Sequence, residues 1–341
     1  MIDDATVAAL GAPLARFLAG DGIVVLDGGL ATELEARGHT LNDALWSARL
    51  LVDDPDAIRA VHEAYLDAGA DCITTATYQA SYPGWAAAGL SEEETDGLYR
   101  RASQLARQAR EAYLERRGVE DRRPAPLVAA SVGPYGAYLA DGSEYDGRYG
   151  VGRTDLDAFH RRRYSVLGAS GVDLLACETI PSALEAEVLL EIAADHPALP
   201  LWISFACRDD RQLWDGSDFE EVVGMCGSSS QVVAVGVNCT APGLVPVLVQ
   251  RARASTDRAV VAYPNSGERY DATERRWRSS GGAAPGGDEW DDVWLRSVLQ
   301  AIRQGARLVG GCCRVGPRQI AALRHAVDSE AWTGSSDDEN R

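Results

Sequence analysis

The sequence predicts an α/β fold, and within that class a (β/α)8 TIM barrel, on three observations. Eight short runs rich in β-branched residues recur along the 341-residue chain. These runs are apolar on both faces, as parallel strands are when both sides of the sheet are covered. Segments with helical composition separate the runs, and strands that alternate with helices are typical of a barrel of this length.

The predicted strands are short and regularly spaced along the chain. They are Ile23–Asp27, Asp71–Thr77, Pro126–Gly133, Asp173–Thr179, Leu201–Cys207, Val232–Cys239, Ala259–Asn265 and Leu308–Cys313. The alternative architecture is an open, doubly wound sheet. No G-x-G-x-x-G sequence follows the first strand, which weakens that alternative in its dinucleotide-binding form.

Helices are predicted from their boundaries as well as from their composition. Pro55–Ala70 follows Asp54, a favourable N-cap, and has a proline in its first turn. Glu92–Arg117 is long, charged and rich in helix-forming residues. The remaining predicted helices are Asp155–Ala169, Pro181–Ala194, Phe219–Cys226, Pro242–Ala254, Asp291–Gln304 and Pro317–Val327. Each predicted strand is therefore followed by a helix, as the barrel requires.

Two stretches carry neither a strand nor a helix signal. Ser266–Asp288 contains clusters of glycine, serine and proline and is predicted to be a long loop after the seventh strand. Residues 331–341 are mostly small, polar and acidic, and are predicted to form a disordered tail. Neither stretch resembles a linker between two cores, so we expect residues 1–330 to form a single barrel domain.

Composition excludes several classes of function. The 33 basic residues against 51 acidic ones give a net charge of −18, which repels nucleic acid. All basic residues are arginine, which excludes Schiff-base aldolases, pyridoxal-phosphate enzymes and P-loop nucleotidases, since each needs a lysine. No basic amphipathic segment, and no apolar run of the roughly 18 residues that a membrane span needs, is present. We expect a cytoplasmic protein that acts on small molecules; its oligomeric state is not predicted.

The seven cysteines are an odd number, which argues against a disulfide framework. Cys239 ends the sixth predicted strand, and Cys312 and Cys313 end the eighth. The carboxyl ends of barrel strands converge on one face, where three thiolates with an open fourth position suit a catalytic zinc ion. Gly310 and Gly311 would let the backbone bend so that both adjacent cysteines face the metal. Buried apolar thiols and a strained redox bridge remain alternative interpretations.

Four strand-end motifs occur together and in one order along the chain. They are Leu26-Asp27-Gly28-Gly29, Val237-Asn238-Cys239, Tyr263-Pro264-Asn265-Ser266-Gly267 and Gly310-Gly311-Cys312-Cys313. Over about residues 20 to 328 the chain resembles the homocysteine S-methyltransferase family, which includes betaine-dependent enzymes and the homocysteine half of cobalamin-dependent methionine synthase. The resemblance implies a (β/α)8 barrel with Zn2+ held by Cys239, Cys312 and Cys313. The other four cysteines match no ligand motif and are expected to be packing residues: Cys72, Cys177, Cys207 and Cys226.

One further segment narrows the resemblance. The stretch from Ser131 to Tyr145, SVGPYGAYLADGSEY, is similar to the branch of the family that uses S-methylmethionine or S-adenosylmethionine. The resemblance therefore implies methyl transfer from a sulfonium donor to the thiol of homocysteine, which gives methionine. Attack of a thiolate on a sulfonium neutralises charge, so a dry pocket favours the reaction. S-methylmethionine is the first candidate donor, S-adenosylmethionine the second and betaine the third.

Candidate substrate contacts lie at the same strand ends. The resemblance places Asp27, followed by Gly28, and Glu178 near the amino-acid end of homocysteine, where they would bind its ammonium group. Backbone amides near Ser131 and Val132 would hold its carboxylate. Both carboxylates also have a structural interpretation, Asp27 as a turn residue and Glu178 as a first-turn residue that faces a helix dipole.

Aromatic side chains are expected to face the donor, because a cation binds well over a ring. Tyr78, Tyr135, Tyr138 and Tyr145 lie in loops on the predicted active face, and Tyr135 and Tyr138 are the candidate contacts among them. Asn265 is expected either to hold the pocket through side-chain hydrogen bonds or only to shape the Pro-Asn-Ser-Gly turn.

Two other classes of function compete with the transferase. A barrel hydrolase would use Asp27 and Glu178 as an acid–base pair, but it leaves the three thiols unexplained. A thiol switch would form a reversible bridge between Cys312 and Cys313 and would turn over no donor. About one zinc per chain supports the transferase, whereas a metal-free and fully active enzyme supports the hydrolase.

Overall fold

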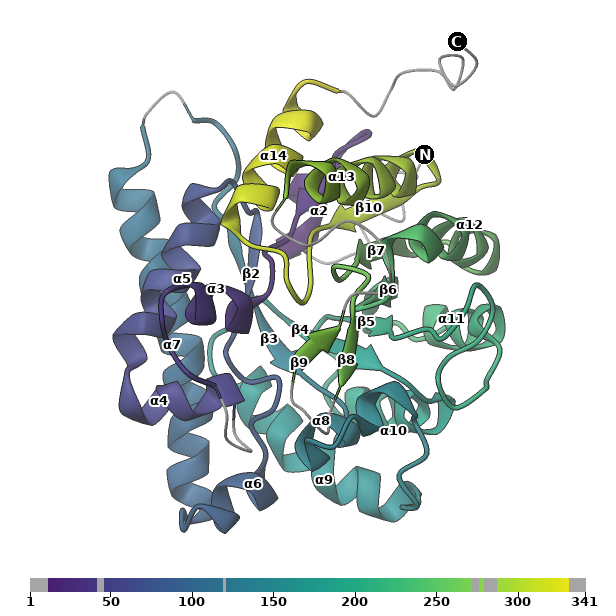
Figure 1. Cartoon of the computed structure of the whole chain (residues 1–341). Coiled ribbons are helices and arrows are strands. Elements are labelled where there is room, and N and C mark those ends of the chain that lie inside the picture. Colours follow the sequence, from purple (N-terminus) through teal and green to yellow (C-terminus); the bar gives the residue numbers. More distant parts are fainter. Residues whose placement is uncertain (1–11, 42–45, 119–120, 272–275, 279–286, 331–341) are drawn as a thin grey trace.

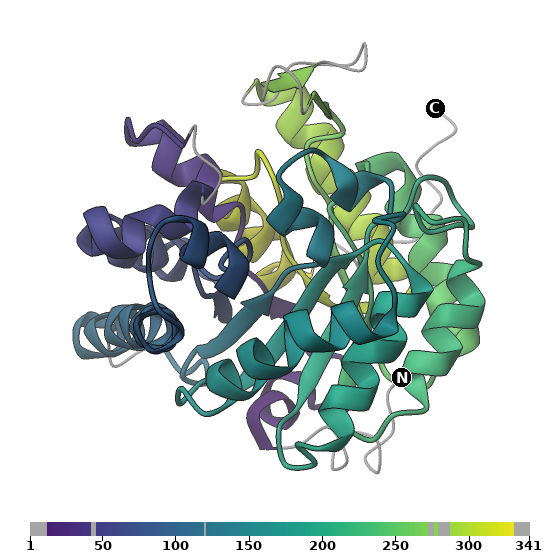
Figure 2. The same cartoon turned by 90° about the horizontal axis from the view of Figure 1, so that it is seen from below.

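In a computed structural model of the chain, residues 12–41, 46–118, 121–271, 276–278 and 287–330 are described. The predicted tail, residues 331–341, lies outside this part. So does most of the glycine- and proline-rich portion of Ser266–Asp288. Strands occupy the centre of the molecule and helices surround them, as Figure 1 and the view from below in Figure 2 both show.

Eight parallel strands confirm the predicted barrel. They are β1 (Val24–Val25), β2 (Cys72–Thr74), β3 (Leu127–Val132), β4 (Leu174–Ile180), β5 (Leu201–Phe205), β6 (Val232–Asn238), β7 (Ala259–Tyr263) and β10 (Ala306–Val309). Their order in the sheet is β1-β10-β7-β6-β5-β4-β3-β2. A parallel bridge between Leu26 and Cys72 brings the two edge strands together, and the Asp27 N–H donates to the Cys72 carbonyl at 3.0 Å. These contacts close the barrel between β1 and β2.

The helices form the outer layer. They are α2 (Ala12–Leu18), α3 (Leu30–Ala36), α4 (Leu50–Asp53), α5 (Pro55–Asp67), α6 (Tyr82–Ala87), α7 (Glu92–Arg116), α8 (Tyr135–Leu139), α9 (Arg153–Gly168), α10 (Ala183–Ala194), α11 (Phe219–Gly227), α12 (Val245–Ser255), α13 (Asp288–Arg303) and α14 (Pro317–Asp328). Three 3-10 turns supplement them: η1 (Trp46–Arg49), η2 (Ser143–Tyr145) and η3 (Pro242–Leu244). The Asp54 side chain caps α5 as predicted, by accepting a hydrogen bond from the Ala57 N–H. Among the described helices, none combines the length and the apolar character needed to cross a bilayer.

Side-chain alternation along the strands decides what the mouth of the barrel contains. Successive residues of a strand point to opposite faces, so every second residue enters the barrel. Leu127 and Ala129 of β3 belong to the inner cluster, and the same alternation brings Ser131 inward. The Val132 side chain points to the opposite face of the strand and packs in the layer between strands and helices. The alternation likewise turns Glu178 of β4 toward the interior. The amino end of the barrel is filled by apolar side chains of α2.

Several predicted boundaries extend too far. The predicted strand Ile23–Asp27 is regular only over Val24–Val25, and Leu308–Cys313 corresponds to β10, Ala306–Val309. Beyond these points the backbone bonds to neighbouring loops instead of continuing the ladder. For example, the Gly311 N–H donates to the Asp27 carbonyl at 3.0 Å.

The prediction of a loop over Ser266–Asp288 is wrong in part. Strand β8 (Arg269–Asp271) pairs antiparallel with β9 (Arg276–Arg278), with Tyr270 opposite Trp277 in the register. Tyrosine and tryptophan favour strands, and this signal was obscured by the neighbouring glycine and serine clusters. The short helices α2, α3, α4, α6 and α8 were not predicted either, because they are too short to show a clear helical period.

His62 of α5 is fully buried, and neither ring nitrogen has a hydrogen-bond partner within the described part of the chain. Burial lowers the pKa of His62 from 6.5 to about 4. As the pH falls below 6.5, His62 binds a proton in the unfolded chain but not in the folded protein. The folded state therefore loses stability between pH 6.5 and about pH 4, where His62 becomes protonated in the folded protein as well. This one group accounts for about 3 kcal/mol over that range.

We therefore expect His62→Leu to reduce the loss of stability between pH 7 and pH 4. Leucine fills the site without a group that must be protonated or hydrogen-bonded. Urea unfolding of both proteins across this pH range provides the measurement. The difference in unfolding free energy should move in favour of the variant as the pH falls, and a difference that is constant with pH would contradict the assignment.

Candidate active site

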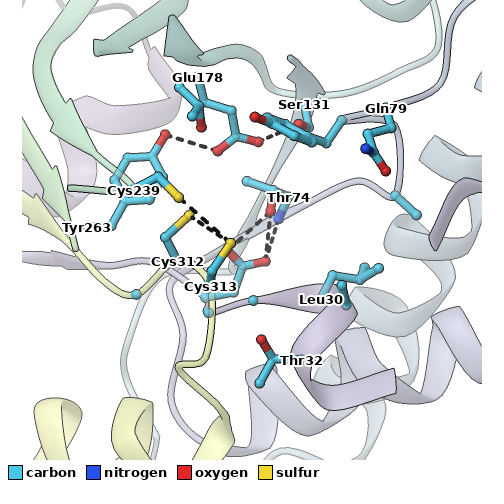
Figure 3. Close-up of a pocket in the computed structure, with 18 of the residues that line it drawn as sticks. Leu30, Thr32, Thr74, Gln79, Ser131, Glu178, Cys239, Tyr263, Cys312 and Cys313 are labelled. Carbon is cyan, nitrogen blue, oxygen red and sulfur yellow. Dashed lines mark hydrogen bonds between the residues drawn. The ribbon is translucent and has the colours of Figure 1, made fainter. Parts of the chain in front are cut away.

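Three thiols meet at the mouth of the barrel. The Sγ atom of Cys239 lies 3.7 Å from that of Cys313, and the Sγ atoms of Cys312 and Cys313 are 4.0 Å apart (Figure 3). All three sulfurs lie within 4.8 Å of one another. Tetrahedral zinc with Zn–S bonds of about 2.3 Å separates its sulfur ligands by about 3.8 Å. The cluster therefore has the spacing of a zinc site with three protein ligands.

Asn265 fixes the backbone that presents Cys239. Cys239 has a φ of +47°, a left-handed conformation that is uncommon outside glycine. The Asn265 Nδ2 group donates to the Cys239 carbonyl at 3.0 Å, and its Oδ1 accepts from the Gly267 N–H at 2.8 Å. Asn265 thus both shapes its own turn and holds the neighbouring strand end, although it does not line the pocket.

A second asparagine holds another strained strand end. Thr179, at the end of β4, has a φ of +61°, which is rare for a β-branched residue. Asn238 accepts from the Thr179 N–H at 2.7 Å and donates to its Oγ1 at 2.7 Å. The same amide nitrogen lies 4.0 Å from the Cys312 sulfur. Strained backbone conformations occur often at functional sites, where surrounding contacts hold them in place. Here the side-chain amides of Asn265 and Asn238 hold the two strained residues, Cys239 and Thr179.

The glycines of the strand ends allow close approach of neighbouring chains. A Cβ atom on Gly310 would lie 2.8 Å from the Asp27 carbonyl oxygen, and one on Gly311 would lie 2.1 Å from the Val315 side chain. Gly28 is similarly confined, with the Val315 carbonyl oxygen 2.4 Å from the place of its Cβ. Neither Gly310 nor Gly311 has a positive φ, so the structure requires glycine at these two positions for close packing and not for a left-handed conformation.

The thiols share their protons. Hydrogen bonds from Cys312 and Cys313 lower the pKa of Cys239, and the bonds to Cys239 raise the pKa of both partners. The Tyr145 hydroxyl lies 3.3 Å from the Cys239 sulfur and adds a further polar contact. Ionisation of all three thiols would place three like charges close together, which a cation among them would stabilise.

Two buried carboxylates line the same pocket. Asp27 accepts hydrogen bonds from the Thr74 N–H at 2.7 Å and from the Thr74 hydroxyl. Glu178 accepts from the Tyr263 hydroxyl at 3.0 Å and from the Ser131 hydroxyl. Burial raises the pKa of Asp27 to about 8 and that of Glu178 to about 7. Neither carboxylate pairs with an arginine in the described residues, so both can receive a cationic group of a ligand.

All the ionisable side chains that line the pocket are neutral or negative. Its wall includes four carboxylates, Asp27, Glu35, Glu144 and Glu178, besides the three thiols. Among the described residues that line it, none is arginine or histidine. Such a wall attracts a cation and has no basic side chain with which to hold an anion.

Of the four tyrosines predicted on the active face, two line the pocket and two do not. Tyr78 and Tyr145 line the pocket. Tyr135 and Tyr138 do not: their rings lie 5.6 Å apart, and both pack against Phe159 of α9, at 5.0 and 5.7 Å between centroids. Helix α8 turns this second pair toward the outer layer, so of these four rings only those of Tyr78 and Tyr145 can face a ligand.

A buried network anchors the loop that follows β3. Glu185 accepts hydrogen bonds from the Tyr135 N–H at 2.6 Å and from the Tyr149 hydroxyl at 3.0 Å, and it lies 2.8 Å from His160 Nε2. Arg163 Nη2 lies 2.8 Å from His160 Nδ1. Arginine only donates, so Nδ1 accepts and the His160 proton is on Nε2, which donates to Glu185. Burial lowers the pKa of His160, consistent with a neutral ring.

The pocket brings together most of the residues that the sequence predicts for the site. The predicted residues that line the pocket are Asp27, Gly28, Ser131, Glu178, Cys239, Cys312 and Cys313. The predicted contacts Val132, Tyr135, Tyr138 and Asn265 lie outside its wall. Thr74, Tyr263 and Glu144 also line the pocket and were not predicted to do so. Of these, Tyr263 points into the barrel, as do Ala259 and Val261 on the same strand, β7. The remaining cysteines Cys72, Cys177, Cys207 and Cys226 are buried, as predicted.

The fold and the site together define a barrel enzyme with a thiol-rich centre in an acidic pocket. The family model described as Homocysteine S-methyltransferase matches residues 24–327. Homocysteine S-methyltransferase of Escherichia coli is 45% identical over 312 residues, which cover 92% of this chain and 97% of that protein. Homocysteine S-methyltransferase YbgG of Bacillus subtilis is 40% identical, covering 88% and 93% of the two chains.

A solved structure agrees with these relatives. The homocysteine methyltransferase MmuM from Escherichia coli, in its metallated form, superimposes with a TM-score of 0.80 at 43% identity, covering 92% of this chain and 99% of that one. The chain belongs to the homocysteine S-methyltransferase family. The resemblance seen in the sequence, the barrel fold and the expected class of enzyme, a methyltransferase, are thereby confirmed.

Proposed function

We propose that this enzyme transfers a methyl group from a sulfonium donor to the thiol of L-homocysteine, with Zn2+ held by Cys239, Cys312 and Cys313. The observation that carries the proposal is the meeting of three sulfurs, at the spacing of zinc ligands, with two buried carboxylates in one pocket. S-methylmethionine is the first candidate donor and S-adenosylmethionine the second. The Escherichia coli relative whose structure is described as metallated supports a metal at this centre.

The acceptor would lie between the thiols and the carboxylates. When bound, zinc would supply a Lewis acid that lowers the pKa of the homocysteine thiol. Asp27 and Glu178 would bind the ammonium group, and a cation at that place would return both carboxylates to their charged form. Thr74, Ser131 and Tyr263 hold the two carboxylates by hydrogen bonds. This support fixes the direction in which the acceptor sulfur points, which favours in-line attack.

The pocket favours a sulfonium over betaine as the donor. In the transfer the acceptor sulfur, which has lost its proton to solvent, forms a bond to the methyl carbon while the donor methyl–sulfur bond breaks. The electron pair of the broken bond stays on the donor sulfur, so a cationic sulfonium becomes a neutral thioether. A cationic donor favours the charged form of the carboxylates in the acidic wall and is stabilised by them, whereas betaine is neutral overall. The faces of Tyr78 and Tyr145 can contact the sulfonium. Membership of a methyltransferase family also removes the support for a hydrolase that uses Asp27 and Glu178.

Turnover of homocysteine with each donor separately tests the proposal. We expect methionine to form with S-methylmethionine, more slowly with S-adenosylmethionine and not with betaine, and we expect about one zinc per chain. Activity with betaine alone would overturn the choice of donor. Since a Brassica oleracea relative, 41% identical, is named selenocysteine Se-methyltransferase, selenocysteine belongs in the assay as a second acceptor.

Asn265→Ala is expected to weaken metal binding without unfolding the barrel. The change removes the hydrogen bond to the Cys239 carbonyl and the one from the Gly267 N–H, so the strained strand end is no longer held. Loss of such supporting bonds typically lowers metal affinity by about 10- to 100-fold. Competition with a chromophoric zinc chelator measures the affinity. Ser266→Ala, in the same turn but without a bond to Cys239, is the control and should bind zinc as the wild type does.

A further inference from the structure

Two oxygen atoms in the pocket wall lack a hydrogen-bond donor within the described part of the chain. They are Oε1 of Gln79 and Oε2 of Glu144, and both are shielded from solvent. Both residues line the same pocket as the three thiols. A buried acceptor left unpaired costs free energy, and such groups in a native structure call for an explanation. In a pocket wall, a ligand that brings N–H or O–H groups would pair both oxygens.

Both acceptors are anchored on helix α8. The Gln79 Nε2 group donates to the Ala137 carbonyl at 3.2 Å, and because a carbonyl only accepts, this bond fixes which end of the amide turns away from α8. Glu144 belongs to η2, whose backbone lies against α8: a Cβ atom on Gly136 would be 2.5 Å from the Glu144 nitrogen. The Gln79 side chain and the backbone that carries Glu144 are therefore both held against the α8 side of the pocket.

This side is separate from the carboxylates proposed to bind homocysteine. Asp27 and Glu178 lie at the ends of the strands β1 and β4, whereas Gln79 and Glu144 lie in the loops after β2 and β3. Figure 3 shows Gln79 across the pocket from Cys239 and Tyr263. Burial raises the pKa of Glu144 to about 7, and the charge of Cys239 contributes to the rise. A cationic group beside Glu144 would relieve both effects.

We propose that Gln79 and Glu144 form a second ammonium-binding subsite, which takes the α-ammonium group of the methyl donor. The inference rests on the proposed function, since it assumes a sulfonium amino acid as donor. An ammonium group carries three N–H donors, which is enough to supply both oxygens. A sulfonium has no N–H to offer, and neither has the quaternary nitrogen of betaine, so either would leave the two acceptors unpaired. The subsite therefore selects donors that are amino acids.

The test compares two sulfonium compounds that differ in the amino group. S-methylmethionine carries it and dimethylsulfoniopropionate does not; the second is measured as a competitor of the first. Glu144→Gln should raise KM for S-methylmethionine by about 10- to 100-fold, the usual range for a hydrogen bond to a charged group. The inhibition constant of dimethylsulfoniopropionate and KM for homocysteine should both change less than threefold. Gln79→Met should raise KM for S-methylmethionine about three- to tenfold, as expected for a neutral acceptor.

Asp141→Asn is the matched control. It removes a negative charge from the same loop, but its side chain is exposed and accepts hydrogen bonds from Ser143. This variant should bind both sulfonium compounds as the wild type does. If Glu144→Gln weakens both compounds equally, or weakens neither, the subsite is overturned while the wild-type activity still supports the proposed function. If the wild type turns over no sulfonium donor, the proposed function and the subsite both fail.

Discussion

Replacement of Cys239 by alanine is expected to abolish zinc binding and to lower activity by at least about 1,000-fold, while the barrel stays folded. Cys239 contributes one of three sulfurs, and the two that remain stand on adjacent residues of one loop. Two ligands from a single loop leave half of a tetrahedral site to solvent, so affinity falls steeply. The acceptor thiol would then remain protonated, and a thiol is a poor nucleophile.

Three measurements check this expectation: zinc per chain, methionine formed, and the thermal unfolding midpoint. Cys226→Ala is the matched control, because Cys226 is buried in α11 away from the cluster. It should keep both zinc and activity, though it loses some stability through a small cavity. An active, zinc-containing Cys239→Ala protein would show that the sulfur cluster is not the metal centre.

Glu178→Gln is expected to lower kcat/KM for homocysteine by about 100-fold, mostly through KM. The substitution keeps the size of the side chain but removes the charge that would pair with the ammonium group. It also places an amide nitrogen beside the Ser131 or the Tyr263 hydroxyl, both of which now bond to carboxylate oxygens. Ground-state and transition-state binding of the acceptor should weaken together, because the ammonium group does not change in the reaction.

KM for the methyl donor, measured in the same variant, shows whether the loss is specific to homocysteine. Donor KM should stay within about threefold of wild type, since Glu178 is assigned to the acceptor alone. Ser204→Ala, which removes a different hydrogen bond to the Tyr263 hydroxyl, controls for disturbance of the network. Equal loss for donor and acceptor would assign Glu178 a general role in shaping the pocket.

The barrel could be predicted from sequence because strands covered on both sides leave contiguous apolar runs. The same property hides the pocket. When both faces of a strand are apolar, the run does not reveal which residues point inward, so the inward Tyr263 of β7 and the outward Val132 of β3 could not be distinguished. The three cysteines of the cluster could be assigned to the mouth of the barrel because they follow strands, and the ends of all eight strands converge there.

The loops resisted prediction for a different reason. The segment from Ser131 to Tyr145 contains a five-residue helix and a three-residue 3-10 turn, both too short to show a periodic pattern. Whether Tyr135 or Tyr145 faces the pocket depends on how this loop is held. The Tyr135 N–H donates to Glu185 of α10, and His160 of α9 contacts the same carboxylate. Long-range hydrogen bonds of this kind leave no local trace in a sequence.

The meeting of the first and last strands has a consequence for biosynthesis. Cys313 comes 74 residues after Cys239, and the Thr32 hydroxyl accepts a hydrogen bond from the Arg314 N–H, 282 residues further along the chain. Contacts of such separation carry a large loop-closure entropy and form late in folding. On a ribosome, the nascent chain would expose an incomplete set of thiols for most of its elongation. Metal capture would then follow translation of the eighth strand and accompany the final closure of the ring.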